Sequence, residues 1–168
     1  MDFAAPVVTY VRSSVAGLPR AFWYLWLGTL INRLGLFISP FLTLFLTSQR
    51  GLTVEHATLL ISLEGLGSFV AQISGGFFCD HFGRRLTMLI SFFVSPVLMI
   101  MLYQETTILG LVVLILLYGF FIDLYRPASG AMIADVVPPE DRVRAFSLRY
   151  WAVNLGAAGA LSLAGFLA

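Results

Sequence analysis

The stretch GGFFCDHFGRR, from Gly75 to Arg85, joins two long apolar runs through a short charged turn. Gly83 permits a sharp reversal of the chain, because glycine adopts backbone angles that other residues avoid. Asp80 stands before the reversal, where an acid can cap a helix end, and Arg84 and Arg85 can remain in water beside lipid headgroups. The stretch therefore predicts a helical hairpin whose turn lies at a membrane surface.

The composition of the chain predicts that its helices are embedded in a membrane. Of its 168 residues 59% are hydrophobic and 11% are charged, whereas soluble domains have about 45–50% and about 25%. Segments that reach the roughly 17–25 residues needed to cross a bilayer are 22–47, 57–79, 87–103 and 108–137, and a fifth, 150–168, is expected to be an incomplete span. The predicted fold class is all-α, a polytopic transmembrane helix bundle. Residues 22–168 are expected to form this bundle, and residues 1–21 are expected to form a separate N-terminal segment.

The distribution of arginine predicts the orientation of this bundle. With a cytoplasmic N-terminus, Arg50 is the one loop arginine that faces outward, and the cytoplasmic side receives Arg12, Arg20, Arg84, Arg85, Arg142, Arg144 and Arg149. Cytoplasmic loops of membrane proteins have an excess of basic residues. We therefore expect a multi-pass protein of the plasma or inner membrane, with residues 1–21 as a cytoplasmic segment.

Several kinds of site are not expected in this chain. Cys79 is the single cysteine, which excludes an internal disulfide and a CxxC motif, and only two histidines, His56 and His81, are available for a metal. No GxxxxGK[ST] loop occurs, so neither ATP nor another cofactor is implied. The arginines lie at segment ends and form no single basic face, so nucleic acid is not an expected partner.

Five residues of the hairpin resemble the loop between helices 2 and 3 of the major facilitator superfamily: Gly76, Asp80, Gly83, Arg84 and Arg85. His81 departs from that pattern, which has Arg or Lys there. The stretch from Arg126 to Gly156 is similar to the helix 4 to helix 5 region of bacterial drug-efflux members, although Ile115 stands where the helix 4 signature has Arg. The resemblance implies about five spans of the N-terminal six-helix half, and a missing C-terminal half as its partner.

The same resemblance implies a conformational latch at the cytoplasmic surface. In the superfamily an acid at the position of Asp135 pairs with the loop arginine and helps to hold the outward-facing form. The expected latch comprises Gly76, Asp80, Gly83, Arg84, Arg85 and Asp135, in which Gly76 lets neighbouring helices approach. The alternative is a plain surface salt bridge, which contributes about 0–1 kcal/mol.

Small residues at four-residue spacing predict close helix packing. Gly67, Ala71 and Gly75 recur in this way in the second span, and the fifth contains Ala152, Gly156, Ala160 and Ala164. Small residues on one face of a membrane helix let the backbones of two helices approach.

Four ionisable residues interrupt the apolar spans: Arg33, Glu64, Asp123 and Arg126. A helix rises about 1.5 Å per residue, which places the two acids in one layer of the membrane and the two arginines in the next. Buried charges cost at least ~2.5–3.5 kcal/mol each when unpaired, so they should neutralise one another or face a wet cavity. The quartet could be a permanent ion-pair lock, a proton-exchange site at Asp123 or Glu64, or a site where an arginine binds an anionic substrate group. Asn32 could join such a polar pathway or form an interhelical hydrogen bond.

The function expected from these features is secondary active transport of a small molecule, as proton-coupled efflux by alternating access. Helix 4 lines the central cavity in the superfamily, which favours Asp123 over Glu64 as the exchanging acid. The lipid bilayer, a small-molecule substrate and protons as coupling ion are the expected partners. The alternatives are a non-transporting membrane subunit, an inactive truncated product, or an intramembrane enzyme, although no HExxH, GxSxG or GxGD pattern occurs.

Overall fold

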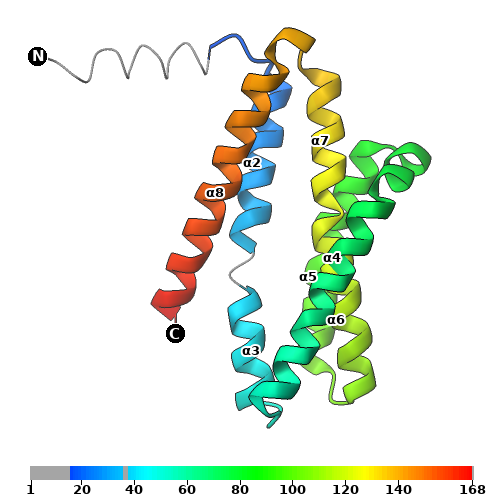
Figure 1. Cartoon of the computed structure of the whole chain (residues 1–168), viewed down its shortest axis with the longest axis vertical. Helices are drawn as coiled ribbons and strands as arrows, with labels where there is room; N and C mark the ends of the chain where they lie inside the picture. The colour runs from blue at the N-terminus through cyan, green and yellow to red at the C-terminus, as the bar shows by residue number, and fades with distance from the viewer. Residues whose placement is uncertain (1–15, 36–37, 168) are drawn as a thin grey trace, which may run out of the picture.

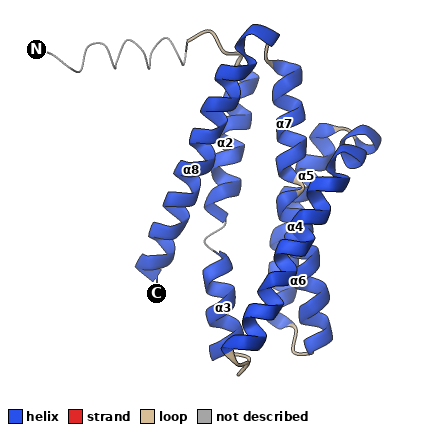
Figure 2. Cartoon of the chain, in the orientation of Figure 1, coloured by secondary structure: helices blue, strands red, loops and turns tan. Residues whose placement is uncertain are grey.

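The computed structural model describes residues 16–35 and 38–167, so most of the predicted N-terminal segment, 1–21, lies outside the described residues. Within the described ranges all regular elements are helices and none is a strand, which confirms the all-α prediction (Figure 2). The elements are α2 (Arg20–Leu34), α3 (Ile38–Ser48), α4 (Val54–Phe82), α5 (Arg84–Gln104), α6 (Ile108–Asp123), α7 (Tyr125–Val136), the 3-10 helix η2 (Pro139–Asp141) and α8 (Arg142–Leu167).

Among these elements three helical stretches are long and apolar enough to cross a membrane: Val54–Phe82, Arg84–Gln104 and Ile108–Val136. Each extends slightly beyond the corresponding predicted span or matches it closely. Within the predicted span 22–47 the structure describes α2 and α3, and residues 36–37 between them lie outside the described residues. Pro40 is the third residue of α3, and a proline is tolerated in a first helical turn because it lacks only an N–H that has no partner there.

The chain runs up and down between two ends of the bundle (Figure 1). The turn between α4 and α5 lies at the same end as the turn that leads from α7 into α8, and an ion pair between Arg84 and Asp135 joins them. At the opposite end Arg50 Nη2 donates to the carbonyl of Tyr103 over 2.6 Å, which joins the loop after α3 to the end of α5.

Two helix pairs pack through small residues: α4 packs on α6, and α2 packs on α8 (Figure 1). A Cβ added to Gly67 would stand 2.7 Å from the backbone nitrogen of Phe120, and one added to Gly156 would stand 2.9 Å from the carbonyl oxygen of Leu30. Ala71, Ala152 and Ala160 are buried as well, which confirms the predicted packing faces at these positions. The side chain of Ala164 lies outside the described part.

Gly76 differs from its prediction. A Cβ on Gly76 would meet nothing within 4 Å, whereas one on Gly75 would stand 2.8 Å from Cβ of Pro127. Within the described residues the close approach between α4 and α7 therefore depends on Gly75, and the packing role predicted for Gly76 is wrong. The two glycines are adjacent on a helix, so they point about 100° apart and only one can face the neighbouring helix.

The connections are fixed by local hydrogen bonds. Gly83 ends α4 and begins α5 with φ of 81°, a left-handed angle that favours glycine. In the turn between α5 and α6, hydrogen bonds from the side chain and backbone of Thr107 and the backbone of Thr106 lower the pKa of the Glu105 carboxyl. Thr107 also caps α6 by accepting from the N–H of Gly110. These hydrogen bonds hold the turn between α5 and α6 short, so the two helices are antiparallel neighbours.

The core divides where α6 meets α7. Buried apolar residues of α6 join one cluster with α3, α4 and α5, whereas Ile133 of α7 joins a second cluster with α2 and α8. Ile122 is the last member from α6, and Ile133 belongs to the second cluster. The junction at Asp123 and Leu124 therefore lies between the two hydrophobic clusters along the chain.

Candidate functional site

The junction between α6 and α7 lies directly before Pro127, the third residue of α7. Proline has no N–H, so it cannot donate to the carbonyl of Asp123 four residues earlier, and the regular helix is interrupted there. The N–H of Leu124 still donates to Phe120 O over 3.0 Å, which keeps α6 and α7 in nearly one direction. The carbonyl of Ile122 accepts weak hydrogen bonds from Asn32 Nδ2 at 3.5 Å and Ser91 Oγ at 3.4 Å. The carbonyl of Ile122 on α6 thus has polar contacts with α2 and α5 at the level of Asp123.

Asp123 forms ion pairs with two arginines at this level. Its Oδ1 lies 3.4 Å from Arg33 Nη2, and its Oδ2 lies 3.6 Å from Arg126 Nη1. The side chains of Arg33 and Asp123 are only 7% and 12% exposed, whereas that of Arg126 is 42% exposed. Charge-assisted hydrogen bonds are usually about 2.7–2.9 Å long, so both pairs are loose. The three residues form a buried triad in which one carboxylate serves two guanidinium groups.

Arg33 is enclosed by α8 as well as by α6. A Cβ on Gly156 would stand 2.5 Å from Cβ of Arg33, so the glycine is what allows α8 to pack over this arginine. Arg33 Nε is buried and has no hydrogen-bond partner among the described residues. The guanidinium therefore depends on Asp123 for its compensation, and this end of α2 is held between α6 and α8.

Tyr125 positions α7 against α2 beside the triad. Its hydroxyl donates to the carbonyl of Leu25 over 3.3 Å and lies 3.4 Å from Thr29 Oγ1. A Cβ on Gly28 would stand 2.8 Å from this hydroxyl oxygen, so α2 needs glycine there. These contacts fix the distance across which Arg33 reaches Asp123.

Glu64 lies on α4 at its crossing with α6. It is partly buried, and a Cβ on Gly119 would stand 2.8 Å from the Cα of Glu64, so the two backbones are in contact. Tyr118, the neighbour of Gly119, is 1% exposed and its hydroxyl has no hydrogen-bond partner within the described ranges. Of the predicted quartet the ion pairs of the triad join Arg33, Asp123 and Arg126, and Glu64 stands at the helix crossing one turn earlier along α6.

The predicted latch residues lie around the turn between α4 and α5. Arg84 and Asp135 form an ion pair, with side chains 38% and 42% exposed, which is the contact that the resemblance implied. Arg84, Arg85, Asp135 and Gly83 line a shallow pocket of about 520 Å³. Asp80 and Arg85 are exposed, and neither forms an ion pair with any residue that the structure describes. The structure therefore joins α5 to α7 through Arg84 and leaves Asp80 outside that pair.

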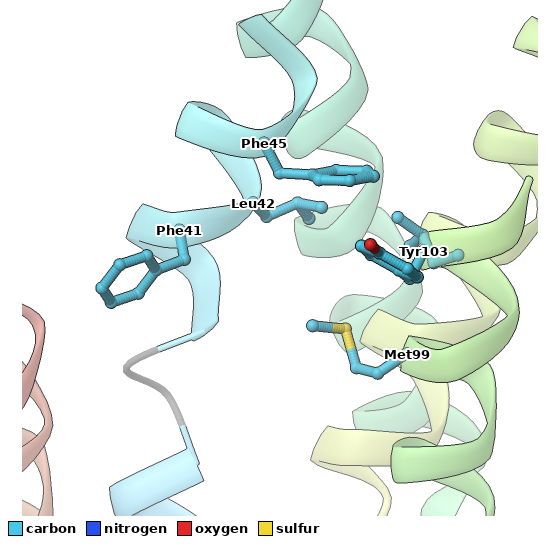
Figure 3. Close-up of a pocket in the computed structure, with 6 residues that line it drawn as sticks. Phe41, Leu42, Phe45, Met99 and Tyr103 are labelled. Atoms are coloured by element: carbon cyan, nitrogen blue, oxygen red, sulfur yellow. The ribbon is translucent and has the colours of Figure 1, made fainter. Parts of the chain in front are cut away.

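A second pocket lies between α3 and α5 at the opposite end of the bundle. In Figure 3 Leu42 and Phe45 of α3 stand across from Met99 and Tyr103 of α5. The pocket has a volume of about 200 Å³ and an apolar lining. The rings of Phe45 and Tyr103 are 5.8 Å apart, and the Arg50 guanidinium lies 5.1 Å from the centre of the Phe45 ring. Tyr103 contributes the one side-chain hydroxyl among the lining residues, and the other lining side chains are apolar.

Sequence reasoning missed two parts of the site. Arg149, which the charge pattern placed with the cytoplasmic loops, is half-buried against α7, where its Nη2 donates to Arg126 O over 3.0 Å and to Ser129 Oγ over 2.9 Å. Ser91 and the Ile122 carbonyl were also not foreseen. The position of Pro127 was the available signal for the interruption at Asp123; the inward direction of Arg149 had no signal in the sequence.

Comparison with known proteins decides the family of this fold. The sequence model described as Major Facilitator Superfamily matches residues 25–168. The chain belongs to the Major Facilitator Superfamily. The match begins within α2 and covers every later helix that the structure describes. It agrees with a multi-pass membrane protein.

Three relatives illustrate the similarity. The uncharacterized MFS-type transporter YqjV of Bacillus subtilis is 31% identical over 135 residues, 80% of this chain and 33% of YqjV. A Na(+), Li(+), K(+)/H(+) antiporter of Planococcus maritimus is 33% identical over 124 residues, 70% of this chain and 28% of that protein. The uncharacterized MFS-type transporter YttB of Bacillus subtilis is 29% identical over 154 residues, 90% of this chain and 38% of YttB. The chain thus spans about a third of the length of the curated relatives that it matches.

Proposed function

We propose that this chain forms the N-terminal part of a secondary active transporter that exports a small molecule by alternating access, in exchange for protons. The main support is the ion-paired triad of Arg33, Asp123 and Arg126 in a Major Facilitator Superfamily fold. Asp123 and Arg126 lie in a helical stretch that is long and apolar enough to cross a membrane. Ionisable side chains inside a membrane bundle mark transport or proton pathways more often than they serve packing alone. One relative named as a cation/proton antiporter is compatible with proton coupling.

Within this proposal Asp123 keeps the helices in register, and Glu64 is the acid that exchanges the proton. Asp123 lies between two guanidinium groups, and neutralising it would leave the buried Arg33 uncompensated. Glu64 is partly buried on α4 and is not one of the three triad residues. The geometry thus favours Glu64, in contrast to the preference for Asp123 that the superfamily position of helix 4 suggested.

The test uses the protein encoded by the complete reading frame, in everted membrane vesicles that carry a proton gradient reported by an acridine dye. Addition of ethidium, NaCl or KCl should release protons if one of these probes is exchanged. Glu64→Gln should reduce this release at least tenfold at equal membrane abundance, because an amide cannot bind the exchanged proton. Glu55→Gln is the matched control, since Glu55 is an exposed acid in the first turn of the same helix. Normal exchange by Glu64→Gln would remove Glu64 from the mechanism.

The orientation of the bundle is part of the proposal, with the N-terminus in the cytoplasm. Gln49 and Val143 are both exposed and lie near opposite ends of the helices. In a Cys79→Ala background, a cysteine at position 49 is expected to react with an impermeant thiol reagent added outside intact cells, and a cysteine at position 143 is not. The reverse labelling pattern would invert the topology and contradict the assignment of the latch to the cytoplasmic side.

We also propose that Arg84 and Asp135 act as the core of a cytoplasmic latch that favours the outward-facing form. Both side chains are more than a third exposed, so their ion pair should contribute no more than about 1 kcal/mol to stability. Asp135→Asn is therefore expected to lower transport severalfold while membrane abundance stays nearly unchanged. Asp80→Asn, which removes an exposed acid outside the pair, should have the smaller effect. An equal loss of abundance and transport in Asp135→Asn would assign the pair to folding.

A further inference from the structure

Three arginines from three helices meet beside the junction of α6 and α7. Arg33 of α2 and Arg126 of α7 flank Asp123, and Arg149 of α8 reaches the backbone of Arg126 and the hydroxyl of Ser129. Arg149 lies seven residues into α8, about 10 Å along the helix axis from its start. It is therefore directed into the bundle and is not a residue of the loop before α8.

The charges at this place do not balance within the described residues. The three guanidinium groups are accompanied by two carboxylates, Asp123 of α6 and Glu64 of α4, so one positive charge is in excess even when both acids are ionised. An excess charge inside a membrane bundle is costly and is usually compensated by a ligand, by another charged group or by water.

Hydrogen-bond donors at the cluster are also unused. The Arg33 side chain is 93% buried, being 7% exposed, and its Nε has no acceptor in the described part of the chain. Arg149 Nε is buried and likewise has no acceptor there. The distances of 3.4 Å and 3.6 Å from Asp123 to its two arginines are long, so that carboxylate does not fully occupy either guanidinium. The Arg126 side chain is 42% exposed and leaves the cluster open on one side.

We propose that Arg33, Arg126 and Arg149 bind an oxyanion, the carboxylate or phosphate group of a small molecule, between α2, α7 and α8. A guanidinium presents parallel N–H groups whose spacing matches two oxygens of such a group. The negative charge offsets the excess charge of the cluster and supplies acceptors for the unused donors. This inference rests on the proposed transport function, since it assigns a substrate class to the same polar region.

The experiment measures binding to the complete protein in nanodiscs of phosphatidylcholine, whose headgroups carry no net charge. Sodium phosphate and sodium benzoate are the two probes, and sodium chloride at equal ionic strength is the reference. At least one probe should raise the melting temperature saturably, and the comparison of the two identifies which oxyanion the cluster prefers. The same measurement in phosphatidylglycerol nanodiscs tests whether a lipid headgroup occupies the site. If it does, free phosphate should raise the melting temperature less in phosphatidylglycerol than in phosphatidylcholine.

Arg149→Gln and Arg126→Gln should each weaken the binding of that probe at least tenfold. Arg20→Gln, which removes an exposed arginine at the start of α2, should leave it unchanged. Arg149→Lys keeps the charge but not the paired N–H groups, and is expected to bind more weakly than the wild type; it also serves if Arg149→Gln does not fold. No saturable shift with either probe in either lipid, or equal binding by the arginine variants and the wild type, would overturn the inference and assign the compensating charge to a carboxylate elsewhere in the protein.

These results are separable from those on transport. Proton exchange in vesicles without oxyanion binding would overturn the oxyanion site and leave the proposed coupling in place. Saturable, arginine-dependent binding without proton exchange would overturn the proposed coupling and leave the oxyanion site in place.

Discussion

Asp123→Leu is expected to lower the free energy of unfolding by about 3–5 kcal/mol, the usual cost of removing one partner of a buried ion pair. The reason is Arg33, whose side chain is 7% exposed and whose ion pair with Asp123 is the one that the structure describes for it. Without the carboxylate a guanidinium would remain buried and uncompensated. The measurement is equilibrium unfolding of the purified protein in mixed micelles, followed by helix content.

The three positions of the triad should not be equivalent. Arg33→Leu leaves Asp123 with its second partner, Arg126, and should therefore cost less than Asp123→Leu. Arg126→Gln should cost about 1 kcal/mol or less, because the side chain is 42% exposed and its pair with Asp123 is 3.6 Å long. In the double variant Arg33→Leu/Asp123→Leu both buried charges are gone, and the loss of stability should be smaller than the sum of the two single losses by a coupling energy of about 0.5–3 kcal/mol.

A different ranking would contradict the structural role of the triad. If Arg126→Gln destabilised more than Asp123→Leu, the buried partner of Asp123 would have been assigned wrongly. If Asp123→Leu were neutral at normal abundance, the carboxylate would be dispensable for folding and would become available again as the proton-exchanging acid in place of Glu64.

The sequence predicted the order of the helices and their packing faces because these depend on local patterns. Long apolar runs set the spans, Gly83 set the reversal between α4 and α5, and small residues at four-residue spacing marked the contact faces of α4 and α8. Each signal has a physical cause that acts within a few residues of its own position. The ion pair of Arg84 with Asp135 was predictable only through the resemblance to a family, since the two residues are far apart in the sequence.

The polar site was harder to predict for two reasons. A proline can interrupt a membrane helix or be accommodated within it, and a long charged side chain can extend in more than one direction. Pro127 is the third residue of α7 and follows the junction with α6, whereas α5 continues through Pro96 without interruption. Proline alone thus does not decide where a membrane helix is interrupted. Arg149 illustrates the second difficulty: an arginine near a helix end can extend toward water or into the bundle, and the neighbouring helix determines which.

Gly67→Ala is expected to destabilise the bundle by about 1–3 kcal/mol or more, although alanine is the better helix former. The added Cβ would stand 2.7 Å from the backbone nitrogen of Phe120 and 3.1 Å from the carbonyl carbon of Leu116. These are backbone atoms of α6, so no side-chain rotation can relieve the overlap and the two helices must move apart. Equilibrium unfolding in the same mixed micelles measures the loss.

Gly65→Ala is the matched control, because Gly65 lies two residues away on α4 and a Cβ there would meet nothing within 4 Å. This change should stabilise the protein by up to about 1 kcal/mol through helix propensity alone. Similar effects of the two substitutions would show that α4 and α6 are not in backbone contact. Gly119→Ala tests the same crossing from the other helix, since its Cβ would stand 2.8 Å from the Cα of Glu64. Because Gly67 and Gly119 share one contact, the double variant should lose less than the sum of the two single losses: once the helices have moved apart for one added methyl group, the second finds part of the space already open.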